Sequence, residues 1–180
     1  MGLFNLFGKK NSIPEMKDLV WKNQIGKQNA CFNLNDQFPG AIWISWFSET
    51  QKDFNNFFAT KNQVFPDIKM ARAIQSYMVA DKTVIFLEHY PLRTVEEDLI
   101  QSWESKEIFV LNSLDEPLFE QFGGQRIVGL MESLGMKDDE QIEHPMIGKS
   151  IKNAQDKLQK KITIVSSANS SKDWFKMNFG

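Results

Sequence analysis

The feature that most constrains the fold of this chain is an alternation of short apolar runs with helix-forming segments from about residue 41. Four runs are strand candidates: "AIWISWF" (41–47), "QVFP" (63–66), "TVIFLEHYPL" (83–92) and "IFVLNSL" (108–114). The segments 50–61, 67–80 and 94–103 lie between them, and their apolar residues recur at helical spacing. This alternation is typical of a small, mostly parallel α/β sheet with about four strands flanked by helices.

The pattern divides the chain into three parts. Residues 1–40 are expected to form a leader with one helix around "PEMKDLVWKN" (14–23), and residues 41–114 the α/β sheet core. Residues 115–180 are expected to form a helical extension packed on the core. Within these parts, Thr94 with Glu97 is a candidate capping box, and Ser170 or Ser171 is a candidate cap for a short last helix. The run around residues 162–165 is a further strand candidate.

The tripeptide G-K-S at 148–150 invites comparison with a phosphate-binding loop. The full motif, G-x-x-x-x-G-K-[ST], requires a first glycine five residues before Gly148. This chain has Glu143 at that position and Pro145 within the loop. A carboxylate would repel a phosphate, and proline lacks an N–H donor. A helix explains the stretch better, because an apolar stripe recurs at helical spacing. Its members are Ile147, Ile151, Ala154 and Leu158.

Composition excludes several classes of function. The 180 residues carry 21 Lys and Arg against 23 Asp and Glu, so the net charge of −2 gives no general attraction for nucleic acid, and no nucleic-acid partner is expected. The single cysteine, Cys31, excludes an internal disulfide and fits a cytoplasmic protein. No run approaches the roughly 20 apolar residues that cross a bilayer.

The N-terminus combines apolar residues with a following pair of lysines. The apolar residues are Leu3, Phe4, Leu6 and Phe7, and the lysines are Lys9 and Lys10. One interpretation is a peripheral membrane contact at the inner face of the membrane. The other is a hydrophobic tail that docks on the domain itself or on a protein partner.

The polar run after the longest strand candidate is the candidate ligand-binding site. Ligands of parallel sheets bind where the strands end, and four side chains follow this strand: Glu88, His89, Tyr90 and Arg93. The alternative is a polar connection in which Arg93 pairs with Glu96 or Glu97. Because adjacent residues of a strand point to opposite faces, Glu88 and His89 do not predict a metal site. No residue is a candidate for catalysis, since the chain has neither a G-x-S-x-G elbow nor a suitable cysteine.

Residues 117–161, "PLFEQFGGQRIVGLMESLGMKDDEQIEHPMIGKSIKNAQDKLQKK", resemble the SecA preprotein-translocase ATPase family. The shared features are "FGGQRI", a "MESLGM" turn, an acidic run, "IEHPMI" and "AQ" in the next helix. They correspond to the passage from the second nucleotide-binding domain of that family into its helical scaffold, and residues 41–116 are similar in outline. The resemblance implies a helicase-like α/β half-domain, ATP-driven secretion and work at the cytoplasmic face of the membrane.

The departures from the family concern the parts that handle ATP. No segment resembles the first nucleotide-binding domain, and "EEDLIQSWESKE" passes directly to the next strand without the family's arginine-rich motif. We therefore expect a stand-alone, non-catalytic interaction or regulatory module without a cofactor, whose protein partner belongs to the secretion machinery. The alternative is a small-ligand or nucleotide-binding domain that uses the loop 88–93.

Overall fold

A six-stranded, mostly parallel sheet forms the centre of the molecule. The computed structural model describes residues 13–61, 64–120, 123–133, 135–143 and 146–179. The strands are β1 (Met16–Trp21), β2 (Ile42–Ser45), β3 (Ile68–Met70), β4 (Thr83–Phe86), β5 (Glu107–Ser113) and β6 (Gln141–Ile142). They lie in the order β3-β2-β4-β5-β1-β6, and β6 pairs antiparallel to β1. The predicted α/β class is confirmed, with six strands among the described residues in place of about four.

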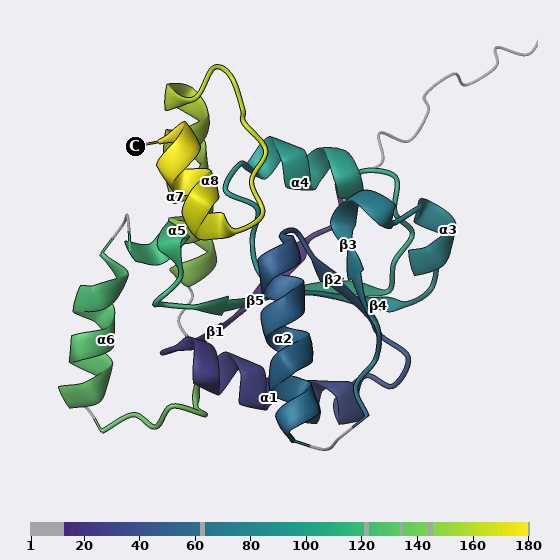
Figure 1. Ribbon diagram of the computed structural model, residues 1–180, viewed down its shortest axis with the longest axis horizontal. Helices are drawn as coiled ribbons and strands as arrows, with labels where there is room; N and C mark the ends of the chain where they lie inside the picture. Colours follow the sequence, from purple (N-terminus) through teal and green to yellow (C-terminus); the bar gives the residue numbers. More distant parts are fainter. Residues whose placement is uncertain (1–12, 62–63, 121–122, 134, 144–145, 180) are drawn as a thin grey trace, which may run out of the picture.

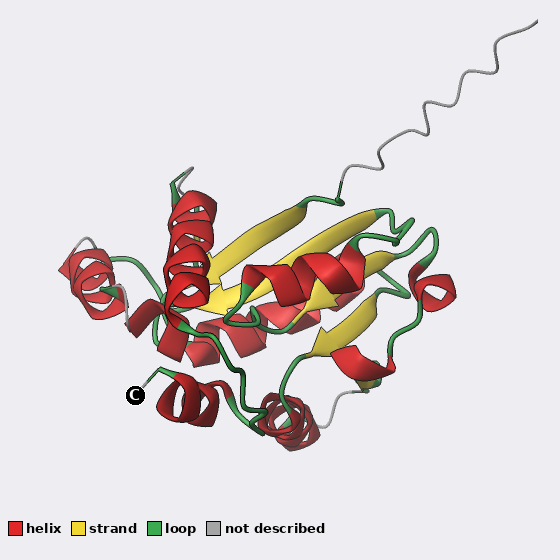
Figure 2. Ribbon diagram, turned by 90° about the horizontal axis from the view of Figure 1, so that it is seen from above, coloured by secondary structure: helices red, strands yellow, loops and turns green. Residues whose placement is uncertain are grey.

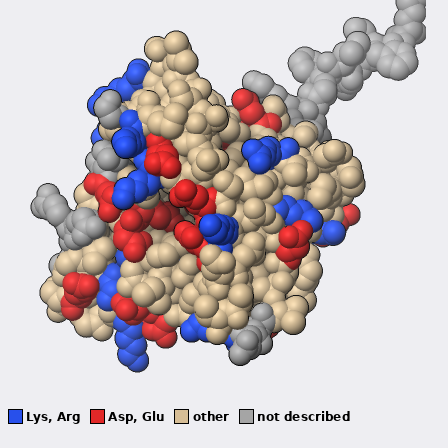
Figure 3. All heavy atoms as spheres, in the orientation of Figure 1, with Lys and Arg blue, Asp and Glu red and all other residues tan. Residues whose placement is uncertain are grey.

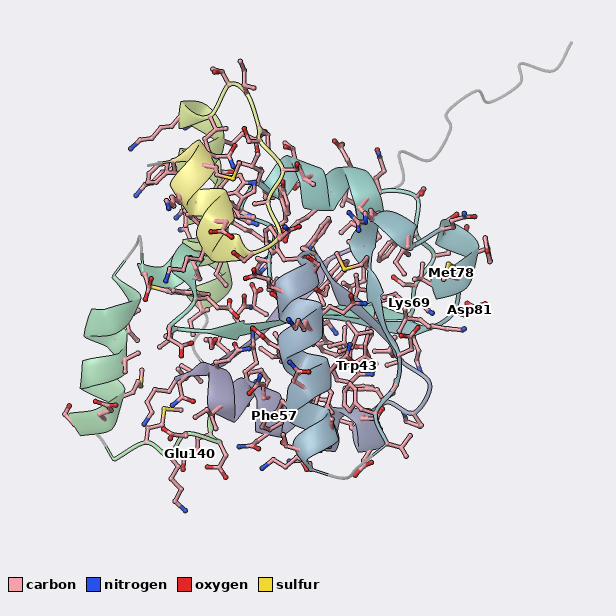
Figure 4. The ribbon with its side chains drawn as sticks, in the orientation of Figure 1. Trp43, Phe57, Lys69, Met78, Asp81 and Glu140 are labelled. Atoms are coloured by element: carbon pink, nitrogen blue, oxygen red, sulfur yellow. The ribbon has the colours of Figure 1, made fainter. Side chains whose placement is uncertain are left out.

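Helices cover both faces of the sheet (Figure 2). On one face lie α1 (Gln24–Gln37) and α2 (Ser48–Thr60), and on the other lie the 3-10 turn η1 (Ala71–Ala73), α3 (Ser76–Val79) and α4 (Arg93–Ile100). Trp43 of β2 and Phe57 of α2, labelled in Figure 4, belong to the first face. The alternation of side chains along β4 places Ile85 toward α1 and α2, and Val84 and Phe86 toward α4.

The remaining helices gather at one end of the sheet, as Figure 1 shows for α5, α7 and α8. They are α5 (Pro117–Glu120), α6 (Gly124–Ser133), α7 (Ile147–Lys161) and α8 (Ser171–Asn178). The apolar stripe predicted for α7 is confirmed, because Ile151, Ala154 and Leu158 are buried. The cap predicted for α8 is also confirmed, since the Ser170 side chain accepts a hydrogen bond from the Asp173 N–H at 3.0 Å.

The helix predicted around residues 14–23 is wrong. Met16–Trp21 form β1, which pairs with β5 over six residues, and the helix α1 begins only after Asn23, whose side chain accepts from the Gly26 N–H. The partner strand lies about 90 positions further along the chain, so no local pattern could reveal it. Pairing with a distant strand outweighs the helical preference of a short segment.

Three other local predictions need correction. The helix predicted over 67–80 is divided into β3, η1 and α3, because Ile68 enters the sheet beside Trp43. Of the "QVFP" strand, Val64–Pro66 are coil, and residues 162–165, which the structure also describes, form coil as well. The predicted capping box is wrong, since α4 begins at Arg93 and the Thr94 hydroxyl instead accepts from Gln159.

Gly26 lies where α1 approaches the loop before β6, and this contact gives a testable prediction. A Cβ atom at Gly26 would overlap the carbonyl group of Asp138. We expect Gly26→Ala to lower the free energy of unfolding by about 1–3 kcal/mol in urea titrations, because backbone atoms must move apart. Gly129 of α6 is the matched control, since a Cβ atom there would meet no atom within 4 Å. Gly129→Ala should raise stability by up to about 1 kcal/mol through helix propensity, and an equal effect of both substitutions would contradict the prediction.

Candidate functional site

The site lies where β2, β4 and β5 end, at the edge of the sheet that faces the C-terminal helices. Ligands of open parallel sheets bind at this edge. Here part of the edge is covered, because α5, α7 and α8 pack over it (Figure 1). Their apolar side chains contact Phe47, which lies between β2 and α2, and Leu92, which directly precedes α4. The candidate loop 88–93 therefore lies between the sheet and these helices.

Glu88 is buried and fixes the turn between β2 and α2. Its Oε1 atom accepts hydrogen bonds from the N–H groups of Trp46 at 2.7 Å and Phe47 at 3.2 Å. The hydroxyl of Ser45 donates to the same oxygen at 3.2 Å. Burial raises the pKa of Glu88 to about 7, although these donors favour the charged form. This carboxyl therefore serves the local fold and also lines the neighbouring cavity.

The His89 side chain connects the loop 88–93 with β1 and α4, and it lines the same cavity as Glu88, because β4 ends at Phe86 and strand alternation does not extend to these two residues. Its Nε2 lies 2.6 Å from Oδ1 of Asp18 in β1, and its Nδ1 lies 2.8 Å from Oε1 of Glu96 in α4. Burial alone would lower the pKa of His89, but the charges of Glu96 and Asp18 outweigh it and raise the pKa to about 10. The imidazolium thus donates from both nitrogens to two carboxylates near neutral pH.

Glu96 extends this network to α7. Its Oε1 also accepts from the Tyr90 N–H at 2.7 Å, and its Oε2 accepts from the side-chain amide of Gln155 at 2.8 Å. Gln155, a buried residue of α7, donates as well to the Tyr90 carbonyl at 2.8 Å. The Tyr90 hydroxyl accepts from the indole N–H of Trp174 in α8 at 3.1 Å. Both C-terminal helices are therefore hydrogen-bonded to the candidate loop.

Arg93 binds carboxylates of the chain itself. Its Nε lies 3.1 Å from Glu97, and its Nη1 lies 3.3 Å from Asp156 of α7. The pairing with Glu97 is the alternative that the sequence left open for this loop. The structure thus brings together Glu88, His89, Tyr90 and Arg93 on one loop, but each of them contacts other parts of the same protein.

Sequence reasoning missed the partners that complete the network. Asp18 was assigned to a helix, and Glu96 was considered only as one of two alternative partners for Arg93. Gln155 had a detectable signal, because it adjoins Ala154 and follows Ile151 by four positions on the apolar face of α7. A polar residue on an apolar helical face indicates a buried hydrogen-bond partner.

Beside the loop lies a cavity of about 360 Å³ with many carboxylates in its lining. In Figure 3, acidic side chains surround a hollow on the face that the figure shows. At its base Lys27 donates to the Leu87 carbonyl at 2.8 Å and forms an ion pair with Glu116. The acidic lining disfavours a phosphate group in this cavity. The carboxylates are Glu49, Asp53, Glu88, Asp115, Glu116 and Glu120.

The described residues form neither a metal-binding cluster nor a membrane-spanning helix. No group of three or more His, Cys, Asp or Glu side chains among them is arranged to hold a metal ion. None of the helices in the described ranges is long and apolar enough to cross a membrane. The apolar residues Leu3, Phe4, Leu6 and Phe7 lie outside the described residues, so both interpretations of the N-terminus stay predictions.

Comparison with known proteins gives similarity over part of the chain. No family model matches it. Over 47 residues the chain is 57% identical to the protein translocase subunit SecA of Acidithiobacillus ferrooxidans, covering 26% of this chain and 5% of that protein. The SecA subunit of Acinetobacter baylyi is 49% identical over 47 residues, with the same shares of each chain. That of Sorangium cellulosum is 49% identical over 49 residues, or 27% of this chain and 5% of the relative. The chain spans about 5% of the length of these curated relatives and is homologous to SecA over about a quarter of its own length.

Proposed function

We propose that this chain is a non-catalytic, SecA-like module that acts in protein export by binding a protein of the secretion machinery. The observation that carries the proposal is the identity of 49–57% to protein translocase subunits SecA over about a quarter of the chain. Identity at this level over 47 residues supports common ancestry of the matched segment. A role in translocation follows by inference from the names of those relatives.

The packing of α7 supports an interaction role for the folded unit. Gln155 and Asp156 bind the loop 88–93, and Ile151 and Leu158 fill the apolar layer above the sheet. The SecA-like helices and the sheet therefore form one unit, whose outer helical surface is available for contacts. The acidic cavity supports the non-catalytic part of the proposal, because phosphoryl transfer requires positive charge around the phosphates.

Site-specific crosslinking in intact cells tests the proposal. A photoreactive amino acid is placed at Lys149, an exposed residue of α7, and in a matched variant at Lys52, an exposed residue of α2. The captured proteins are then identified by mass spectrometry. We expect a component of the protein-export machinery to be captured from position 149 and not from position 52. Capture of no export component from position 149, or equal capture from both positions, would contradict the proposal.

A second candidate function is binding of a small ligand in the cavity beside loop 88–93. Its volume of about 360 Å³ and its position at the strand ends favour such a site. The acidic lining selects a cationic ligand over a nucleotide. The experiment is a thermal-shift screen of polyamines and nucleotides, since a ligand that binds only the folded state raises Tm.

This candidate predicts an increase in Tm with a cationic compound that Asp53→Asn weakens, because Asp53 lines the cavity. Asp36→Asn is the control, since Asp36 is an exposed carboxylate of α1 outside that lining. A shift produced by a nucleotide and abolished by Arg93→Ala would instead support the nucleotide site. A screen in which no compound raises Tm would exclude both the cationic-ligand site and the nucleotide site.

A further inference from the structure

An apolar groove separates α6 from α7. It has a volume of about 370 Å³, and Ile142 of β6 lies at its base. Ile127 is 40% exposed and Met146 58% exposed along its sides. Exposed apolar surface gathered in one groove is a typical binding site for another apolar segment. Other side chains in the lining are Leu118, Phe119, Met131 and Ile147.

An open strand edge leads into this groove. β1 pairs with β5 along its whole length, but β6 pairs only with Val20 and Trp21 of β1. On that side, Met16–Leu19 have no strand partner among the described residues. A trough of about 350 Å³ runs along this edge, between β1 and the start of α7. Because Ile142 and Ile147 line both the trough and the groove, the two lie next to each other.

The segment before residue 13 is long enough to reach the trough and the groove, and it is apolar enough to fill the groove. From Ile13 to Val20, which lies opposite Ile142, the chain covers seven residues, or at most about 23 Å. The ten residues from Ile13 back to Leu3 span up to about 33 Å when extended. Leu3 and Phe4 can therefore reach the groove from the start of β1. Asn11, Ser12 and Pro14 are residue types that favour the reversal of direction required there.

We propose that residues 3–7 dock in the groove between α6 and α7, with residues 8–10 extended along the open edge of β1 after the reversal at residues 11–14. The apolar side chains of the segment would cover the groove, and a strand added to an open edge satisfies its backbone groups. The trough carries charges of both signs, so the apolar residues of the segment and its backbone are what favour docking. The charged residues of the lining are Glu15, Lys17, Asp18, Glu143, Lys149 and Lys152. A partner that uses the groove must displace this segment. The inference goes beyond the proposed function and does not depend on a link to protein export.

Cysteine crosslinking of the full chain tests the docking. The only native cysteine, Cys31, is buried, so it does not compete for oxidation. One variant combines Asn5→Cys with Ile127→Cys, and the control combines Asn5→Cys with Tyr77→Cys, on the exposed surface of α3. We expect an intramolecular disulfide at least tenfold faster in the first variant, at a rate independent of protein concentration. Equal rates would overturn the proposal, as would a covalent dimer that disappears on dilution, which would assign the groove to a second copy.

A second measurement uses an apolar fluorescent dye and anionic phosphatidylglycerol vesicles. Leu3→Ser combined with Phe4→Ser should expose the groove and increase dye fluorescence at least twofold. Ile164→Ser with Val165→Ser removes two apolar residues from an exposed loop and should leave fluorescence unchanged or lower. The chain could instead sediment with the vesicles, lose this binding when Leu3 and Phe4 are replaced, and show no fast crosslinking to position 127. That combination would assign the segment to lipid and overturn the proposal.

Discussion

Replacement of Lys27 by methionine is expected to lower the free energy of unfolding by about 3–5 kcal/mol, the usual cost of breaking a buried ion pair. Lys27 is 1% exposed, and its Nζ binds both the Leu87 carbonyl and the Glu116 carboxylate. Its Nζ also lies 5.4 Å from the centre of the Phe54 ring. Methionine fills a similar volume, so the expected loss comes from the charge. It leaves Glu116, whose side chain is only 17% exposed, without its counter-charge.

Urea unfolding at pH 7 measures this effect, and two variants separate its causes. Adding Glu116→Gln to Lys27→Met should recover most of the lost stability, because no unpaired charge remains buried. Lys17→Met is the matched control, since Lys17 pairs with Glu107 at the exposed surface. That change should cost less than about 1 kcal/mol. A loss of similar size for Lys17→Met and Lys27→Met would show that burial of the pair does not matter.

Acid should reduce the effect of Lys27→Met. Burial raises the pKa of Glu116, while Lys27 lowers it. Without Lys27, the carboxyl group takes up a proton at higher pH and loses its charge. The difference in stability between the variant and the original chain is therefore expected to be smaller at pH 5 than at pH 8, as parallel urea titrations would show.

The parts of the fold that sequence could predict are those with local signals. The apolar runs at β2, β4 and β5 and the stripe of α7 depend on neighbours within a few residues, and all four elements are present. β1 depends on β5, and its Lys17 and Asp18 interrupt the apolar pattern by which a strand is recognised in sequence. Asp18 is compatible with that position because His89 provides its counter-charge.

The position of the candidate site could be predicted from the sequence, but its hydrogen bonds and ion pairs could not. Glu88 and His89 were identified because they follow a strong strand, which places them at the edge of the sheet. Their partners come from elements as distant as β1 and α7. Sequence spacing carries no information about such contacts. Whether the strand ends leave room for a ligand therefore depends on tertiary packing. α7 and α8 cover the loop 88–93, and the acidic cavity lies beside it.

The stability of the chain is expected to fall as pH rises from about 6.5 to about 10, because of His89. Its pKa is 6.5 in a model peptide and about 10 in the folded protein. A group whose pKa is raised by folding stabilises the fold fully below its unfolded pKa, and this contribution disappears as pH passes the folded pKa. One pKa unit corresponds to about 1.4 kcal/mol, so the full contribution of His89 is about 5 kcal/mol, and most of it is lost across this window. Glu88, with a pKa of about 7, adds a loss in the same direction between about pH 4.5 and 7.

Urea unfolding between pH 5 and pH 9 tests this dependence with two variants. Glu96→Gln keeps a hydrogen-bond acceptor for His89 but removes one of the two charges that raise its pKa. We expect the loss of stability in this variant to be smaller and to end at lower pH. Asp156→Asn, which removes a partly exposed carboxylate near Arg93, should leave the profile unchanged. A profile that is equally steep in all three proteins would show that His89 does not control it.

The same titration should reach α7 before it reaches the rest of the fold. Glu96 accepts from His89 on one oxygen and from Gln155 of α7 on the other. Once these contacts open, the pKa of His89 returns toward its ordinary value of 6.5, so between pH 6 and pH 9 the opened state releases a proton that the closed state keeps, and opening becomes more favourable. Because Gln155 is held by the Glu96 carboxylate and by Tyr90, α7 is the helix whose attachment weakens most. Amide hydrogen exchange, after correction for its intrinsic pH dependence, should therefore increase in α7 at pH 9 relative to pH 6, while exchange in β4 and β5 stays slow.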